Sequence, residues 1–176
     1  MRSSTQAPEL IPWNMLQDRL DGSFAARARG LLRASYTLTD RSGTPFAELR
    51  ARGGRVTLTA GSLEIEIEGD SRGGYRMLSG GTELARAASP GGSATVLRVE
   101  CAGQAYEARL RLLSNVTVVH TLDGSEEVSE VARLSGGLAG RRYKAVFDAE
   151  VQGALPVAIL VLYHSVTLRR RIYLAG

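Results

Sequence analysis

The chain has 176 residues, of which 44% are hydrophobic and 23% are charged, a balance typical of one globular domain rather than a disordered or membrane-embedded chain. The single cysteine excludes an intramolecular disulfide and a multi-cysteine zinc site, and two histidines leave little for a histidine-based metal centre. The formal net charge of +4 is too small to indicate a nucleic-acid partner unless the basic residues gather on one face.

Residues 1–33 are predicted to be an N-terminal extension that contains one short helix. Trp13, Leu16 and Leu20 have the spacing of one helix face. Residues 23–33 are able to extend that helix or to follow it.

The clearest hairpin is predicted over residues 55–68, RVTLTAGSLEIEIE. Apolar residues alternate with Thr or Glu on both sides of Gly61-Ser62, a two-residue loop with glycine first, as a type II′ turn requires. This loop pairs Ala60 with Leu63, so every apolar side chain falls on one face of the hairpin. A slip of one residue would bury three glutamates, so the register is well specified.

The same layout recurs along the chain and indicates an internal repeat of one hairpin unit. Further hairpins are predicted over residues 36–50, 75–87, 95–111 and 116–134, with turns at residues 40–43, 80–81, 103–104 and 123–124. The second strands of the repeat resemble one another and read FAELR, ELARA, YEARL and EVARL. With residues 143–148 as a further strand, the sequence predicts a long antiparallel meander that curls into a barrel or into two packed sheets.

One of these hairpins contains an electrostatic conflict. With its turn at residues 103–104, it places Arg98 opposite Arg109 and Glu100 opposite Glu107. Like charges directly opposite one another destabilise a strand pair. Either diagonal Glu–Arg contacts offset the repulsion, or the loop is longer than two residues.

Residues 155–168, LPVAILVLYHSVTL, do not alternate. The segment is apolar all round at its start, and Pro156 suits a first helical turn. A strand is the alternative, because Val157, Ile159 and Val161 are β-branched, but the length of the segment favours a helix. A helix without a polar face has to be enclosed on all sides. The apolar run is far shorter than the ~20 residues of a membrane-spanning helix, and no secretory signal is visible, so we expect a cytoplasmic protein, at most peripheral at the membrane.

The hairpins followed by one strand and an apolar helix resemble the Tubby C-terminal-like superfamily, which includes the LURP-one-related proteins and the phospholipid scramblases. The residues that carry the resemblance are YTLTDRSGTPFAELR at 36–50, the repeated turn-then-strand units, and YKAVFDAEVQGALPVAILVLYHS at 143–165. The resemblance assigns residues 34–176 to the barrel domain. It implies a mainly β fold, a twelve-stranded antiparallel meander barrel that encloses one C-terminal hydrophobic helix.

Two features depart from the family pattern. Residues 13–33 have no counterpart in it. The basic strand signature by which tubby proteins hold phosphoinositides is absent, so no binding residue is carried over from the family.

The residues that could carry catalysis fit structural roles better. Cys101 and His164 fall at apolar positions and are expected in the core, and His120 is expected to pair with Glu127 across a hairpin turn. The glutamates of residues 64–68 form a flat ladder, which suits a solvated strand face and not a calcium site. We therefore predict a protein that is not an enzyme and that holds no cofactor and no metal.

Basic clusters are the remaining candidates for a functional site, because arginine binds phosphate and carboxylate bidentately. They comprise Arg50, Arg52 and Arg55, then Arg141, Arg142 and Lys144, and finally Arg169, Arg170 and Arg171. We predict a domain that acts through its surface on anionic phospholipid or phosphoinositide headgroups, or on another protein. The alternatives are a barrel that carries an apolar ligand, with the C-terminal segment as an added strand, and a protein–protein interaction module. The sequence indicates no oligomeric state.

Overall fold

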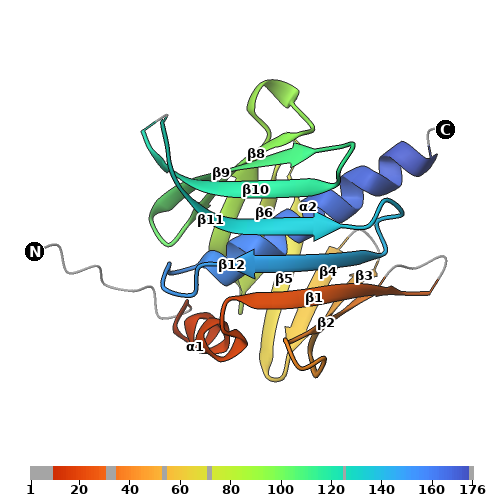
Figure 1. Ribbon diagram of the computed structural model, residues 1–176. Coiled ribbons are helices and arrows are strands. Elements are labelled where there is room, and N and C mark those ends of the chain that lie inside the picture. Colours follow the sequence, from red (N-terminus) through yellow and green to blue (C-terminus); the bar gives the residue numbers. More distant parts are fainter. Residues whose placement is uncertain (1–9, 31–34, 53–54, 71–72, 125, 175–176) are drawn as a thin grey trace, which may run out of the picture.

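In the computed structural model, twelve strands form a closed antiparallel barrel around a helix (Figure 1). The structure describes residues 10–30, 35–52, 55–70, 73–124 and 126–174. The strands are β1 (Ser23–Arg29), β2 (Ser35–Thr39), β3 (Pro45–Arg52), β4 (Arg55–Ala60), β5 (Leu63–Gly69), β6 (Tyr75–Ser79), β7 (Thr82–Ala88), β8 (Val96–Cys101), β9 (Gln104–Arg111), β10 (Val116–Asp123), β11 (Glu126–Gly136) and β12 (Arg142–Phe147). Two α-helices, α1 (Ile11–Leu20) and α2 (Ala154–Leu174), and a short 3₁₀ helix, η2 (Pro90–Gly92), complete the chain.

The hairpin patterns set the wall of the barrel. In β4 and β5 the observed partners include Ala60 with Leu63 and Leu58 with Ile65, which confirms the register predicted from the Gly61-Ser62 turn. The apolar residues of this hairpin point into the barrel, and the threonines and glutamates point outward. Strands follow one another around the wall in chain order, and β1 closes the ring by pairing with both β12 and β2.

Between β8 and β9 the turn lies one residue earlier than predicted. Its central residues are Ala102 and Gly103, both with positive φ, and the register places Arg98 opposite Glu107. The guanidinium of Arg98 then lies 3.1 Å from the Glu107 carboxylate, and Arg109 reaches the same carboxylate at 2.7 Å. The like-charge register predicted from a turn at residues 103–104 is therefore wrong. Opposite charges across the ladder and the same burial of apolar residues make the shifted register the more stable one.

In the hairpin of β10 and β11, Asp123 pairs with Glu126 and is the last residue of β10, so the turn predicted at residues 123–124 begins one residue later. Residue 125 itself lies outside the described residues.

Residues 23–29 form strand β1, so the extension of the helix that was one interpretation of residues 23–33 is wrong over residues 23–29. Phe24 and Ala26 are buried against the interior, whereas Arg27 and Arg29 are exposed, which is the alternation of a strand with one wet face. Without β1, the facing edges of β2 and β12 would carry unpaired backbone groups. Closing the barrel therefore outweighs the weak helix preference of this segment, and the barrel begins at Ser23, ahead of the boundary after residue 33 that the sequence suggested. Residues 31–34 lie outside the described part of the chain.

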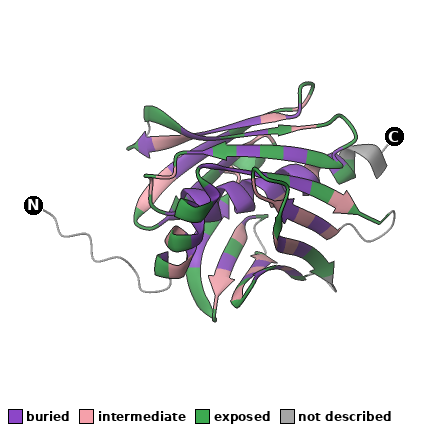
Figure 2. Ribbon diagram, turned by 60° about the horizontal axis from the view of Figure 1, so that its bottom comes forward, coloured by how far each residue is buried: buried purple, intermediate pink, exposed green. Residues whose placement is uncertain are grey.

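Helix α2 fills the interior, as the apolar pattern of residues 155–168 predicted. Leu155 and all residues from Val157 to Leu162 are completely buried, so this part of the helix has no face toward solvent. Figure 2 shows the buried stretch of the helix surrounded by the strands. The strand alternative for this segment is excluded.

Helix α1 lies at the end of the barrel where α2 begins (Figure 1). Trp13, Leu16 and Leu20 are buried, which confirms the helix predicted from their spacing. Gln17 joins α1 to the connection between β12 and α2 through its side-chain amide. Its Nε2 donates hydrogen bonds of 2.8 Å to two carbonyls of the connection between β12 and α2, and its Oε1 accepts the N–H of Leu155 at 2.8 Å. That N–H belongs to the first turn of α2, where backbone donors have no partner within the helix.

Candidate anion-binding surface

The meander brings distant basic residues to one end of the barrel. Because neighbouring strands run in opposite directions, the β1–β2, β3–β4, β9–β10 and β11–β12 connections all lie at the end away from α1. Helix α2 enters beside α1 and leaves at this same end, where the side chain of Arg169 donates a hydrogen bond to the carbonyl of Leu112. We call this end the basic end. Its exposed basic residues are Arg29, Arg55, Arg111, Arg141, Arg142, Arg170 and Arg171.

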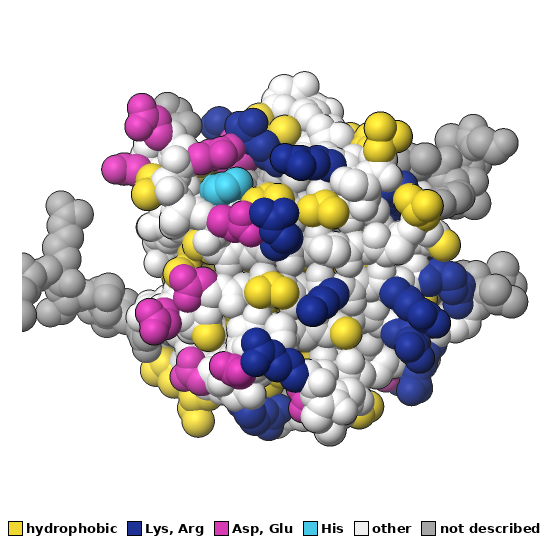
Figure 3. Space-filling model, in the orientation of Figure 1, with side chains coloured by type: hydrophobic (Ala, Val, Ile, Leu, Met, Phe, Trp, Pro, Cys, Tyr) yellow, Lys and Arg dark blue, Asp and Glu magenta, His cyan; other side chains and the backbone are white. Residues whose placement is uncertain are grey.

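Charge is polarised along the length of the barrel on one face of the molecule (Figure 3). On the face shown in Figure 3, acidic side chains gather toward the end with α1, and basic side chains toward the end where α2 finishes. Arg41 and Asp21, at the α1 end, pair with one another at 2.7 Å. Within the described residues, no ion pair joins a carboxylate to Arg29, Arg55 or Arg111, nor to Arg141 or Arg142.

Several of the nine predicted residues make contacts within the protein, among them Arg141, which donates a 3.5 Å hydrogen bond to the carbonyl of Gly30. Arg50 binds the carboxylate of Glu48 at 2.7 Å on the outer wall. Arg169 is buried, and its contact with the Leu112 carbonyl ties α2 to the β9–β10 connection. Arg50 and Arg169 therefore contribute to the fold.

The remaining predicted residues lie on other strands and connections. Arg52 and Arg55 are partners in the backbone register of β3 and β4 at the basic end. Arg142 begins β12, and Lys144 lies two residues further along the same outward face, beside Ala25 of β1.

Arg141 of the second cluster and Arg170 of the third lie near Tyr36. The hydroxyl of Tyr36 donates a 2.6 Å hydrogen bond to the carbonyl of Gly140, next to Arg141. Burial, and then the neighbouring Tyr143, raise the pKa of Tyr36 to about 12, while the positive charges of Arg170 and Arg141 act in the opposite direction. The end of α2 and the β11–β12 connection thus each place one arginine, Arg170 and Arg141, near the same buried tyrosine.

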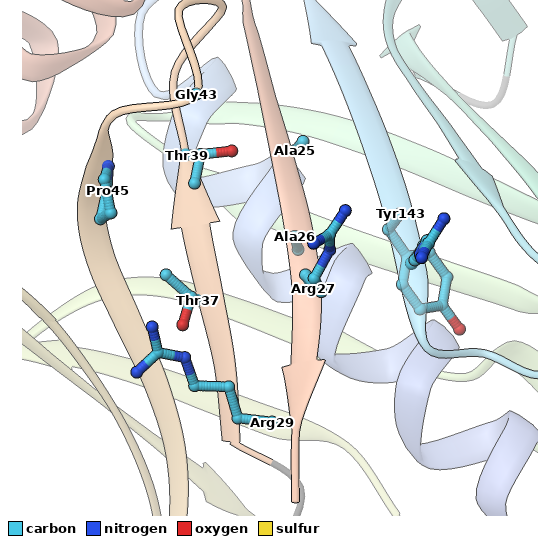
Figure 4. Close-up of a pocket in the computed structure, with 10 residues that line it drawn as sticks. Ala25, Ala26, Arg27, Arg29, Thr37, Thr39, Gly43, Pro45 and Tyr143 are labelled. Atoms are coloured by element: carbon cyan, nitrogen blue, oxygen red, sulfur yellow. The ribbon is translucent and has the colours of Figure 1, made fainter.

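A groove of about 460 Å³ runs along the outer wall across β12, β1, β2 and β3. Its charged lining residues are Arg27, Arg29 and Arg142, and no acidic residue lines it among those described. Figure 4 shows Arg27 and Arg29 projecting from β1, with Thr37 and Thr39 on the neighbouring β2. The groove adjoins the basic end and shares Arg29 and Arg142 with it.

Two exposed leucines accompany the arginines at the basic end. Leu113 is 95% exposed in the β9–β10 connection, and Leu138 is 68% exposed in the β11–β12 connection. The two connections are joined by the side-chain amide of Asn115, which donates a 2.8 Å hydrogen bond to the carbonyl of Gly137. Large apolar side chains in this position cost hydration free energy unless something covers them.

Sequence reasoning missed Arg27, Arg29 and Arg111. The first two lie in the segment expected to be helical, although the alternation FAARAR at residues 24–29 is itself a strand signal. Arg111 ends β9 and was not part of a basic run. Its position at the basic end follows only from the closed topology.

The chemically reactive side chains lie away from the basic surface or are held in internal hydrogen bonds. Burial raises the pKa of the Cys101 thiol to about 12. Burial lowers the pKa of His164, and the Ala94 carbonyl, 2.9 Å from Nε2, partly offsets this. Because the Ala94 carbonyl can only accept, Nε2 of His164 carries the proton and donates to it, and the Tyr75 hydroxyl donates a 3.2 Å hydrogen bond to Nδ1. His120 lies 3.5 Å from Glu127, the pairing expected from sequence.

Two negative findings apply to the residues that the structure describes. Neither helix there is both long and apolar enough to cross a membrane. No group of three or more His, Cys, Asp and Glu side chains is placed to hold a metal ion in those same ranges.

Comparison with known proteins shows the fold and nothing finer. No protein-family model matches the chain, and a search of curated proteins gives no significant match. The X-ray structure of a protein from Arabidopsis thaliana is similar to this barrel, with a TM-score of 0.55 and 15% sequence identity. The similarity covers 81% of this chain and 90% of the plant protein. At this identity the likeness establishes a common fold only.

Proposed function

We propose that this chain is a non-enzymatic barrel domain of the Tubby-like, LURP-one-related kind, and that its basic end binds membranes that contain anionic phospholipids, phosphoinositides included. The observation that carries the proposal is the gathering, by the barrel topology, of exposed arginines from four connections and from the end of α2. Each basic residue near an anionic lipid surface contributes roughly 1 kcal/mol of attraction.

The exposed leucines support a membrane partner over a soluble polyanion. Leu113 and Leu138 lie on adjacent connections of the basic end, next to Arg111 and Arg141. Apolar side chains that enter the boundary between headgroups and acyl chains add to the electrostatic attraction. A soluble polyanion would use the arginines and leave the leucines in water.

The interior of the barrel supports a function at the surface. A carrier of an apolar ligand needs an enclosed apolar space, and α2 occupies that space with completely buried residues from Val157 to Leu162. The raised pKa of Cys101 and the two internal hydrogen bonds of His164 likewise favour structural roles for these side chains.

Co-sedimentation with vesicles tests the proposal. The chain should pellet with phosphatidylcholine vesicles that contain phosphatidylserine, should stay in solution with pure phosphatidylcholine, and should be released by salt. A double variant, Arg111→Gln with Arg141→Gln, should lose about 2 kcal/mol of binding free energy, roughly a 30-fold loss of affinity.

The matched control is Arg86→Gln with Arg133→Gln, which removes the same charge from two exposed wall arginines that pair with glutamates. It should bind almost as well as the original chain. Equal binding to neutral and anionic vesicles, or equal losses in the two double variants, would contradict the proposal.

A further inference from the structure

An uncompensated like-charge pair lies in the wall groove. Arg27 of β1 and Arg142 of β12 are directly opposite in the antiparallel register, and both are exposed on the outer face. Side chains in such positions begin about 5 Å apart, and like charges there destabilise the strand pair. Among the described residues, neither arginine has a carboxylate within 4 Å.

The same wall shows how such a pair is compensated where it serves only the fold. Arg76 of β6 and Arg86 of β7 are also directly opposite one another. Each has its own carboxylate: Arg76 lies 3.0 Å from Glu68, and Arg86 lies 3.1 Å from Glu83. The groove has the repulsion without the counter-charges.

A hydroxyl without a hydrogen-bond partner and a third guanidinium lie next to the pair. Thr37 of β2 lies directly opposite Arg27 and lines the groove, and its hydroxyl oxygen is buried without a hydrogen-bond partner. Buried hydroxyls nearly always have partners, because an unpaired one forfeits its bonds to water. Arg29 lies two residues along β1 from Arg27, on the same face, and supplies a third guanidinium.

Ala25 leaves room beside these groups. It occupies the next row of the wall, between Lys144 and Thr39, and its methyl group leaves the groove open there.

Glu48 of β3 lies opposite Thr37, and its negative charge would repel an anion bound in the groove. Arg50 already pairs with this carboxylate. Arg50 donates to it at 2.7 Å, and this hydrogen bond is the main reason that the pKa of Glu48 is lowered, with a smaller contribution from Arg29. Glu48 does not line the groove. The lining therefore carries three positive charges and no negative one.

We propose that this groove is a binding site for a phosphate monoester group, held by the guanidinium groups of Arg27, Arg29 and Arg142 and by the hydroxyl of Thr37. Guanidinium forks match the oxygens of a phosphate bidentately, and a monoester near neutral pH carries close to two negative charges. The hydroxyl donates to a further phosphate oxygen. The groove adjoins the basic end, but this binding does not require docking on a membrane.

Pyrophosphate, which presents terminal phosphate groups in soluble form, is the first probe. It should raise the urea midpoint of the original chain, because a ligand that binds only the folded state stabilises it. In the variant Arg27→Gln with Arg142→Gln, the midpoint without ligand should rise, because the repulsion is gone, and affinity should fall about 100-fold or more. The control, Arg76→Gln with Arg86→Gln, removes the same charge and should respond to pyrophosphate as the original chain does.

Thr37→Val separates binding from folding. Removing an unpaired buried hydroxyl should leave the stability of the ligand-free protein unchanged or higher, whereas the affinity for pyrophosphate should fall about tenfold. A midpoint that pyrophosphate does not raise in the original chain overturns the assignment. The assignment is also overturned if pyrophosphate raises the urea midpoint of the Arg27→Gln, Arg142→Gln variant as much as that of the original chain.

Vesicles distinguish a lipid source of the phosphate from a soluble one. Phosphatidic acid presents a monoester and phosphatidylserine a diester, so vesicles of matched surface charge separate the two. A preference for phosphatidic acid that pyrophosphate abolishes places a lipid headgroup in the groove, whereas binding of pyrophosphate without such a preference indicates a soluble phosphate compound. Anionic vesicle binding that pyrophosphate does not affect, together with no stabilisation by pyrophosphate, overturns the groove site and leaves the membrane proposal standing. Stabilisation by pyrophosphate without any binding to vesicles overturns the membrane proposal and leaves the groove site standing.

Discussion

Leu160 offers the most direct test of how tightly α2 fills the barrel. Its side chain is completely buried in the middle of the helix. Replacing it with alanine removes three buried carbon atoms, which costs about 2 kcal/mol of transfer free energy. The surrounding wall is hydrogen-bonded to neighbours on both sides all the way round, so it collapses little onto the vacated space. The remaining cavity then adds about 2 kcal/mol, and we expect Leu160→Ala to lower the free energy of unfolding by about 4 kcal/mol.

Equilibrium unfolding in urea, followed by the fluorescence of the buried Trp13, measures this loss. The matched control is Leu113→Ala, the same chemical change at a side chain that is 95% exposed, which should alter stability by at most about 0.5 kcal/mol. A cost below about 1 kcal/mol at Leu160, or equal costs at the two leucines, would refute the tight filling of the interior by α2.

Two further predictions concern the buried polar groups. Gln17→Ala should lower the free energy of unfolding by about 2–3 kcal/mol, because it leaves two carbonyls and the Leu155 N–H without partners. The control Met15→Ala, on the exposed side of α1, should change this free energy little. Unfolding in urea measures both variants. Cys101 should resist a thiol reagent at pH 8 until urea unfolds the chain. Because burial raises the pKa of this thiol from 9.0 to about 12, its contribution to the free energy of unfolding should be complete below pH 9 and should be lost as the pH rises toward 12. If Cys101→Ala loses stability between pH 9 and 10 as steeply as the original chain, that thiol is not protected as described.

The candidate site was partly readable from sequence. Runs such as residues 141–142 and 169–171 mark basic loops and helix ends, and most of these residues do lie at the basic end. The runs alone do not separate Arg169, which is buried and holds the β9–β10 connection, from its exposed neighbours. Which of these arginines is buried depends on which side of α2 faces the strands and on the point at which α2 leaves the barrel.

The groove was not readable from sequence. Arg27 and Arg142 are far apart in the chain and meet only because β1 pairs with β12. Residues 23–29 carry a strand-like alternation, but the nearby helical spacing of Trp13, Leu16 and Leu20 competes with it as an interpretation. The closing of the barrel, which satisfies the backbone groups of two open edges, decides in favour of the strand.

The amino-acid pattern by itself determined those features whose cause is local. Alternation with period two and a glycine at the turn specify the hairpin over residues 55–68, and an apolar segment with no polar face specifies a helix that has to be enclosed. The tertiary structure alone decided that residues 23–29 form the strand that closes the barrel, that the turn between β8 and β9 shifts by one residue, and that arginines distant in the chain lie at one end. These depend on hydrogen bonds and charges between strands distant in the chain, whose free energy exists only once the barrel has closed.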